Sequence, residues 1–195
     1  MGRRSDHSRA ELETLILREG HALMAEVGFA RFSAREVAKR VGYSIGTIHN
    51  VFGSYDRLVL AINTRTFGVW AAHLEARLLQ ASEDRIAALV GGYFDFARDN
   101  THLWMAIYDH RLPLGTVLPA EDAAARAMLT QIVVAEIARA LGGDVERATP
   151  LARSLVALVH GHCSFALTNA FDLMGEADPQ AAALARVRES LAAAC

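Results

Sequence analysis

The segment GFARFSAREVAKRVGYSIGTIHNVFGSYDRL, residues 28–58, decides the fold of the N-terminal part of this chain. Ser33 and Glu36 have the spacing of a capping box, in which a serine hydroxyl and a glutamate carboxylate bond to the free amide groups at a helix start. Apolar residues at helical spacing follow the box. We therefore predict a short helix over residues 34–41.

A second short helix follows after one turn. Gly42 can adopt the left-handed conformation that ends a helix, and Ser44 can cap a helix over residues 45–52 with Ile48 facing inward. Two short helices joined by a tight turn form a helix-turn-helix motif, which we place over about residues 32–51. In that motif the second helix enters the major groove of DNA.

The rest of the chain is also predicted to be helical. Alanine and leucine dominate with 36 and 23 copies, and both are strong helix formers. The pairs Thr149-Pro150 and Asp178-Pro179 look like caps followed by first helical positions, and Gly28 is placed to end the first helix in the left-handed conformation. We expect an all-α chain of about nine helices, over residues 8–27, 34–41, 45–52, 55–79, 82–99, 102–111, 121–141, 150–174 and 179–194.

The composition excludes several classes of protein. Of the 195 residues 52% are apolar and the net charge is −2, which excludes an intrinsically disordered chain. The longest apolar stretches are shorter than the ~20 residues of a membrane span, and the first residues lack the apolar segment of a signal peptide. Two cysteines are too few for a disulfide framework or a four-cysteine zinc site. We expect a cytoplasmic protein without a membrane partner.

The charge is divided unevenly along the chain. Residues 1–65 carry ten basic and seven acidic side chains, whereas residues 66–195 carry ten basic and fifteen acidic ones. A basic N-terminal part suggests an anionic partner for that part only.

The same N-terminal segment resembles the DNA-binding head of TetR-family transcriptional regulators. Small residues, glycines and apolar residues stand at the family's spacing, at Gly28, Phe29, Ser33, Val37, Ala38, Gly42, Ser44, Gly46, Thr47, Ile48, Phe52 and Leu58. The stretches at 93–100 and 158–161 are similar to one subtype of the family's body. The resemblance implies a helix-turn-helix DNA-binding domain over residues 9–65 and a ligand-binding and dimerisation domain over residues 66–195. It also implies three partners: a double-stranded DNA operator, a small-molecule effector and a second copy of the chain.

The candidate DNA contacts lie on or beside the two short helices. They are Ser33, Arg35, Ser44, Ile45, Gly46, Thr47, His49, Asn50 and Tyr55. The resemblance implies a phosphate contact for Thr47 and a position near the backbone or groove edge for Arg35. An asparagine at position 50 can pair with adenine, and Ile45 can either press on a thymine methyl group or pack inward.

Three residues depart from the family pattern. The family has an aromatic residue, most often tyrosine, at the position of His49, often an aromatic residue or histidine at Val51, and a lysine at Tyr55. His49 and Tyr55 can still form hydrogen bonds with phosphates, whereas Val51 cannot. These departures leave open a second hypothesis, a helical small-molecule-binding dimer whose head no longer binds DNA.

The basic residues before and within the first helix also have two interpretations. Arg3, Arg4 and Arg9 either reach the minor groove or backbone, as basic arms do, or form a solvated end of the chain.

The resemblance implies a ligand pocket inside the body, between the fourth helix and the later helices. Aromatic, methionine and polar residues can line such a pocket. The candidate lining residues are Trp104, Tyr108, Met128, His162 and Asn169.

We expect neither a metal nor another cofactor, and no enzymatic activity. His160 and Cys163 could share a metal on one helix face, but no further ligand is near them in the sequence. Asp109 and His110 are neighbours whose side chains diverge on a helix. Nucleophile and phosphate-loop motifs are absent from the sequence, so a small helical enzyme is the weakest of the hypotheses.

The C-terminal helices, over residues 150–174 and 179–194, are the predicted homodimer interface, because the many alanines there let two helices approach closely. The resemblance implies a ligand-responsive DNA-binding transcriptional regulator, most often a repressor, which we expect a small apolar molecule to release from its operator.

Overall fold

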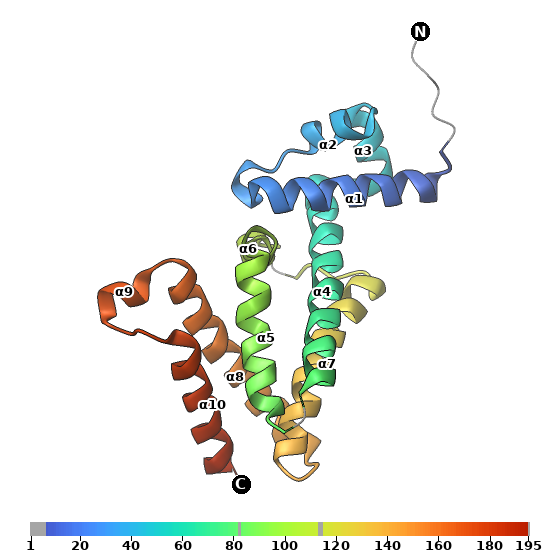
Figure 1. Cartoon of the computed structure of the whole chain (residues 1–195). Helices are drawn as coiled ribbons and strands as arrows, with labels where there is room; N and C mark the ends of the chain where they lie inside the picture. Colours follow the sequence, from blue (N-terminus) through green and yellow to red (C-terminus); the bar gives the residue numbers. More distant parts are fainter. Residues whose placement is uncertain (1–6, 82, 113–114, 195) are drawn as a thin grey trace. The chain divides into compact units, whose positions relative to one another are not determined.

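The computed structural model describes residues 7–81, 83–112 and 115–194, and this part of the chain contains helices and no strands (Figure 1). The predicted all-α class is confirmed. The elements are α1 (Arg9–Val27), the 3₁₀ turn η1 (Phe29–Arg31), α2 (Ala34–Val41), α3 (Ile45–Phe52), α4 (Tyr55–Gln80), α5 (Arg85–Asp99), α6 (Thr101–Asp109), α7 (Ala120–Ala140), α8 (Val145–Leu167), α9 (Ala170–Met174) and α10 (Pro179–Ala194). None of the described helices is long and apolar enough to cross a membrane.

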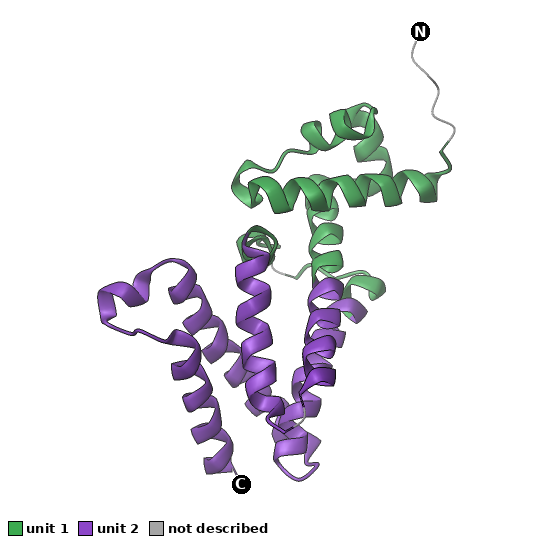
Figure 2. Ribbon diagram, viewed as in Figure 1, with its two compact units in different colours: residues 1–66, 102–123 green, residues 67–101, 124–195 purple. Residues whose placement is uncertain are grey.

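The chain divides into two compact units, coloured separately in Figure 2. The first unit comprises the chain up to Thr66 together with His102–Ala123. The second unit comprises Phe67–Thr101 and the chain from Ala124 onward. The contacts thus assign residues 102–123 to the first unit, whereas the division by sequence left them in the body.

The first unit is built on the mutual packing of α1, α2 and α3. Its core consists of fully or almost fully buried apolar side chains: Ile16, Leu23, Met24, Phe32, Val37, Ala38, Ile48, Leu58, Val59, Ile62, Leu103 and Ala106. A Cβ atom added to Gly20 would lie 2.9 Å from Cδ1 of Ile62. A glycine on α1 therefore lets this helix pack closely against α4.

A capping box starts α1 and not α2. The Ser8 amide donates to Oε2 of Glu11 at 2.7 Å, and the Glu11 amide donates to the Ser8 hydroxyl at 3.3 Å. The hydrogen bond from the Ser8 backbone lowers the pKa of the Glu11 carboxyl.

The capping box predicted at Ser33 and Glu36 was wrong, although α2 begins at Ala34 as expected. The Ser33 side chain makes no capping hydrogen bond. The Glu36 carboxylate lies 3.8 Å from Nζ of Lys39 and 3.9 Å from Nε of Arg40. These two cations, three and four residues further along the helix, draw the carboxylate away from the helix start.

Gly28 ends α1, but not in the predicted left-handed helical conformation. Its φ is +72° and its ψ is 170°, so the chain leaves the helix extended before it turns into η1. A Cβ atom at this position would lie 3.2 Å from the His102 ring. Both the positive φ and the close ring favour glycine.

The predicted helix over residues 150–174 is in fact two helices. Asp144 caps the first, since the Arg147 amide donates to its carboxylate at 3.0 Å. Pro150 therefore lies inside α8 and not at its start. The Thr149 hydroxyl, expected to cap, donates to the Val145 carbonyl at 2.9 Å instead.

Asn169 separates α8 from α9. It has a φ of 57° and lies in the left-handed region, which asparagine tolerates better than most residues. In contrast, the second predicted proline cap is confirmed, because α10 begins at Pro179 and the Ala181 amide donates to the Asp178 carboxylate at 2.9 Å.

The second unit is a bundle in which α5, α8 and α10 pack on one another. Trp70 of α4 is 1% exposed; it stacks on Phe96 with a centroid distance of 5.0 Å and meets the Tyr93 ring edge-on at 4.8 Å. A two-pronged ion pair joins α5 to α7, with both Arg85–Glu136 bonds at 2.7 Å.

Replacing Ser8 with alanine should lower the free energy of unfolding by about 1 kcal/mol, because the hydroxyl caps α1. Ser33→Ala is the matched control. It should lower the free energy of unfolding by less than half as much, because the Ser33 hydroxyl makes no capping hydrogen bond. Urea denaturation of both variants measures the difference, and equal losses would contradict the assignment of the box to α1.

Candidate nucleic-acid interface and ligand pocket

The α3 helix starts with the cap that the sequence predicts. The Ser44 hydroxyl accepts from the Thr47 amide at 3.2 Å and lies 3.1 Å from the Thr47 hydroxyl. Two hydroxyl groups therefore stand together at the amino end of α3, where the helix dipole favours an anion such as phosphate.

The predicted DNA contacts differ in their exposure. Five of them are exposed, namely Arg35, Ser44, Gly46, His49 and Asn50, and the other four are half-buried, namely Ser33, Ile45, Thr47 and Tyr55. Ile45 packs against the core of the first unit, which is the inward-packing alternative that the sequence left open. The exposed polar groups of α3 are thus His49 and Asn50.

Two of the three departures from the family pattern lie against the core. Val51 and Tyr55 are half-buried and pack on it, and the Tyr55 ring lies 6.0 Å from the Phe32 ring. Burial, and then the neighbouring Asp56, raise the pKa of Tyr55. At Val51 and Tyr55 the departure from the family pattern affects packing against the core. The departure at His49 affects the exposed surface of α3.

The residues around the start of α1 contact the turn before α3 and the last residues of α3. His7 Nδ1 lies 2.9 Å from the Tyr43 hydroxyl, just before α3. Arg9 Nη2 donates to the carbonyl groups of Asn50 and Val51 at 3.5 and 3.3 Å. A cation at these last carbonyls also complements the helix dipole.

Arg9 therefore has a role that sequence reasoning missed, because the contact joins residues more than forty positions apart. The other two arginines considered for a basic arm, Arg3 and Arg4, lie outside the described residues.

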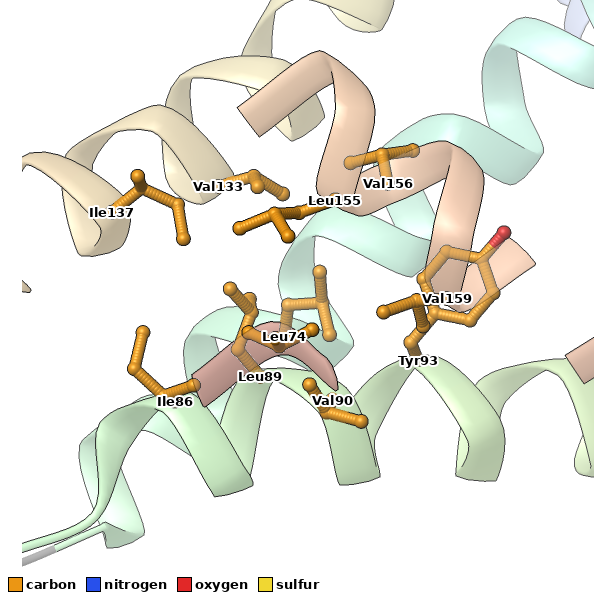
Figure 3. A pocket seen from close by; sticks show the side chains of 11 residues that line it. Leu74, Ile86, Leu89, Val90, Tyr93, Val133, Ile137, Leu155, Val156 and Val159 are labelled. Carbon is orange, nitrogen blue, oxygen red and sulfur yellow. The ribbon is translucent and has the colours of Figure 1, made fainter. Parts of the chain in front are cut away.

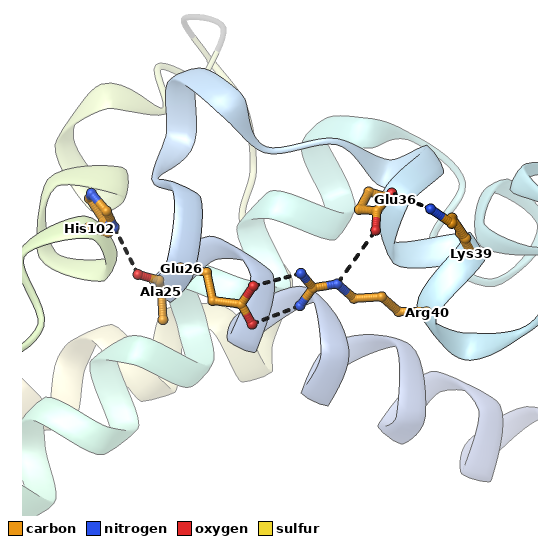
Figure 4. Close-up of polar contacts among 6 residues, drawn as sticks. All are labelled: Ala25, Glu26, Glu36, Lys39, Arg40 and His102. Atoms are coloured by element: carbon orange, nitrogen blue, oxygen red, sulfur yellow. Dashed lines mark hydrogen bonds and ion pairs between the residues drawn. The ribbon is translucent and has the colours of Figure 1, made fainter.

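Ion pairs hold α2 on α1, as Figure 4 shows. Arg40 donates to both carboxylate oxygens of Glu26, at 2.8 and 2.6 Å. This pairing lowers the pKa of Glu26 and raises that of Arg40. On the far side of α1, Nδ1 of His102 lies 2.8 Å from the carbonyl oxygen of Ala25.

Arg35 differs from Arg40. It is exposed and makes no ion pair with any residue that the structure describes. Its guanidinium is therefore available to an external anion, whereas that of Arg40 is engaged within the unit.

An apolar pocket lies in the second unit (Figure 3). It has a volume of about 40 Å³. Helices α4, α5, α7, α8 and α10 supply its lining: Leu74, Ile86, Leu89, Val90, Tyr93, Val133, Ile137, Leu155, Val156, Val159 and Val187. All but one of these side chains are aliphatic. The exception is Tyr93, whose hydroxyl lies 3.0 Å from Nδ1 of His160; burial lowers the pKa of that histidine.

The five predicted pocket residues do not line this pocket. Trp104 and Tyr108 belong to the first unit, where their rings lie 5.3 Å apart. In the second unit Met128 is 48% exposed, and Asn169 is exposed.

His162, the fifth of them, lines a separate pocket with Gly161, Phe165, Phe171 and Met174. The assignment of these five residues to a ligand stays a prediction. The aliphatic lining was missed because valine, leucine and isoleucine at helical spacing look like ordinary core.

The pairs considered for metal binding or catalysis are otherwise engaged. Burial raises the pKa of the Cys163 thiol to about 12, so the metal-binding thiolate is scarce at neutral pH. The neighbours Asp109 and His110 do not pair; His110 Nε2 lies 3.2 Å from Asp56. The described residues contain no group of three potential metal ligands.

Two families of known sequences match the chain. Residues 16–62 match the bacterial regulatory proteins of the tetR family, and residues 86–189 match the tetracyclin repressor-like C-terminal domain. The chain belongs to the TetR family. A TetR-family regulator is a non-enzymatic transcription factor with a DNA-binding N-terminal domain and a ligand-binding C-terminal domain.

The chain is also similar to individual proteins, in sequence or in fold. The HTH-type transcriptional regulator BetI of Brucella suis is 27% identical over 162 residues, which cover 68% of this chain and 80% of BetI. A protein with unknown function from Rhodococcus sp. RHA1 has the same fold, with a TM-score of 0.72 and 21% identity over 99% of this chain and 98% of its own. The multidrug binding protein EbrR, complexed with imidazole, has a TM-score of 0.64 and 19% identity over 95% of this chain and 96% of its own.

Replacing Arg9 with methionine should speed amide hydrogen exchange in residues 45–52 by about 2–5-fold, because two hydrogen bonds to the end of α3 are lost. Arg18→Met is the control on the same helix, since Arg18 pairs only with its neighbour Glu19 among the interactions described. Exchange measured by mass spectrometry reports on α3 directly. Unchanged exchange in the Arg9 variant would show that the contact does not stabilise α3.

Proposed function

We propose that this TetR-family protein is a repressor that binds a double-stranded DNA operator as a homodimer and leaves it when a small apolar molecule binds the body. One observation carries the proposal: α3 is capped at one end, bound by Arg9 at the other, and exposes His49 and Asn50 between them. A short helix presented in this way is what major-groove recognition requires.

On DNA the residues would divide between positioning and base recognition. The hydroxyls of Ser44 and Thr47 and the unengaged Arg35 suit phosphate oxygens. The Asn50 amide suits the paired donor and acceptor of an adenine edge. Gly46, beside the hydroxyls, lets the DNA backbone come close to the helix.

A homodimer supplies two α3 helices for two half-sites one helical turn apart, ~34–36 Å. Exposed apolar side chains on α8 and α9 support an interface there: Val156, Phe165, Leu173 and Met174 are 36%, 46%, 93% and 66% exposed. Apolar side chains gathered on such a surface usually mark a protein contact. We place this dimer in the cytoplasm, where bacterial operators are.

Release from the operator would be a population shift. DNA binds one spacing of the two heads and the small molecule binds another, so each weakens the other by ~1–3 kcal/mol. The α4 helix supplies residues to both units and is one of the covalent links through which such a change would pass. EbrR, a multidrug binding protein of this fold with structures complexed with imidazole and with proflavin, supports a small-molecule site.

The regulator function predicts specific binding to DNA from upstream of the protein's own gene. Fluorescence anisotropy across a salt series should show tight binding that resists competitor DNA and weakens steeply with salt, because phosphate contacts release counterions. Weak binding that is equal on random DNA, followed by an empty selection from a random DNA library, would favour the second hypothesis. In that case the departures at His49, Val51 and Tyr55 would mark a head that has lost DNA binding while the body still binds its ligand.

Thr47→Ala and Asn50→Ala should have different effects on operator binding. The threonine variant should weaken binding to every sequence, because a phosphate contact carries no sequence information. The asparagine variant should lose ~1–3 kcal/mol of discrimination at one base pair. Thr14→Ala, on the exposed face of α1, is the matched control. Equal losses on all operator variants after Asn50→Ala would contradict a base-recognition role.

A further inference from the structure

His49 occupies a different side of α3 from Asn50. Successive residues of an α-helix are rotated by about 100° around the helix axis. Ile48 belongs to the core of the first unit and is 2% exposed. Asn50 therefore lies almost opposite the core, whereas Thr47 and His49 lie on the two flanks of the helix, about 100° to either side of Ile48. Because His49 is exposed, its ring is accessible along one flank of α3.

The two flanks of α3 would face the two phosphate backbones of a DNA duplex. The major groove is about 12 Å wide, and an α-helix with its side chains measures ~10–12 Å across. When Asn50 faces the base edges, one flank of the helix therefore lies beside each strand. Thr47 would meet the phosphates of one strand, and His49 would meet those of the other.

The His49 ring makes no hydrogen bond or ion pair with the residues that the structure describes. The guanidinium of Arg9 lies at the same end of α3, where it donates to the carbonyl groups of Asn50 and Val51. The other charged side chains of the neighbouring elements pair elsewhere or are exposed: Glu36 pairs with Lys39 and Arg40 on α2, Arg35 is exposed on the same helix, Asp56 bonds to His110, and Arg57 is exposed at the start of α4. Since none of these carboxylates pairs with His49, a charge on its ring is left for an external anion.

His7, a second exposed histidine, lies beside the turn that precedes α3 and is engaged within the protein. Its Nδ1 lies 2.9 Å from the Tyr43 hydroxyl. The hydrogen bonds from Ser8 and, to a lesser degree, the charge of His7 lower the pKa of the Glu11 carboxyl. A proton on His7 therefore has an anionic partner in the protein itself, whereas a proton on His49 has none among the described residues.

We propose that the protein takes up a proton at His49 when it binds DNA, so that its affinity for the operator rises as the pH falls from 8 to 6. This inference rests on the proposed DNA-binding function and adds a pH dependence to it. The ring, charged by a proton from solution, donates a charge-assisted hydrogen bond to a phosphate oxygen.

Electrostatics gives the direction of the effect. Imidazole side chains exchange a proton near pH 6.5, whereas a phosphodiester stays negatively charged between pH 6 and 8. A phosphate next to the ring stabilises its charged form. The DNA-bound state therefore binds more protons than the free state, and by linkage a lower pH favours binding. The tyrosine that the family has at this position stays neutral over the same range, so the departure at His49 introduces the dependence.

Fluorescence anisotropy at pH 6.0, 7.0 and 8.0 tests the proposal, with the full-length protein and the duplex that the upstream DNA or the library selection yields. At constant salt the affinity should increase by ~5-fold or more from pH 8.0 to pH 6.0. The slope of log K against log[salt] should steepen by up to ~0.9 for each phosphate that a charged ring neutralises. Titration calorimetry near pH 7, in buffers of different ionisation enthalpy, should show net proton uptake on binding.

Three variants assign the proton. His49→Gln should bind about as weakly at pH 6.0 as at pH 8.0, because glutamine cannot be charged. His49→Lys is charged throughout this range and should bind tightly at both pH values. His7→Gln should retain the pH dependence of the unaltered chain. Circular dichroism at each pH checks that the variants are folded.

The outcomes separate this inference from the proposed function. Specific binding that does not change with pH would contradict the proton uptake and leave the regulator function intact. A pH dependence that survives in His49→Gln, or disappears in His7→Gln, would place the proton on another group and overturn the proposal. The absence of specific binding at every pH would contradict the proposed function and this inference together.

Discussion

The DNA-binding surface depends on one constraint: α3 has only eight residues and is too short to be stable without tertiary support. Burial of Ile48 to 2% exposure fastens its middle to the core of the first unit. The Ser44 side chain satisfies the Thr47 amide group at its start and Arg9 bonds to carbonyl groups at its end. The exposed face of α3 is available to DNA because the other face and both ends are held in this way.

The need of α3 for tertiary support also explains the ion pairs around the helix-turn-helix motif. The Glu26–Arg40 pair fixes α2 on α1, and α2 in turn packs on α3. A guanidinium whose charge is neutralised by a carboxylate attracts a phosphate less strongly than an unpaired one. The first unit thus contains two kinds of arginine, those that bond to the protein itself, such as Arg9 and Arg40, and those left open, such as Arg35. Only the three-dimensional contacts distinguish the two kinds, because they look alike in the sequence.

The pocket of the second unit differs chemically from the exposed polar surface of α3. It contains only carbon surface, and the adjoining charges are paired with each other across α5 and α7. In the proposed function, DNA binding would use exposed polar groups that can exchange water for phosphates and bases, whereas ligand binding in the pocket would use the removal of apolar surface from water. The two proposed sites lie within separate compact units.

The sequence by itself determined the helical class, the family and the bounds of α2 and α3, because glycine, serine and apolar spacing act within a few residues of one another. Local signals failed where other residues close in the sequence compete. Glu36 has the spacing of a capping box, but nearby cations take its carboxylate, and Pro150 looks like a helix start, but the helix begins earlier at the cap that Asp144 supplies. The pocket lining and the role of Arg9 were decided only by the tertiary structure. Both bring together residues far apart in the chain, and the aliphatic side chains of a pocket carry no signal that separates them from those of a filled core.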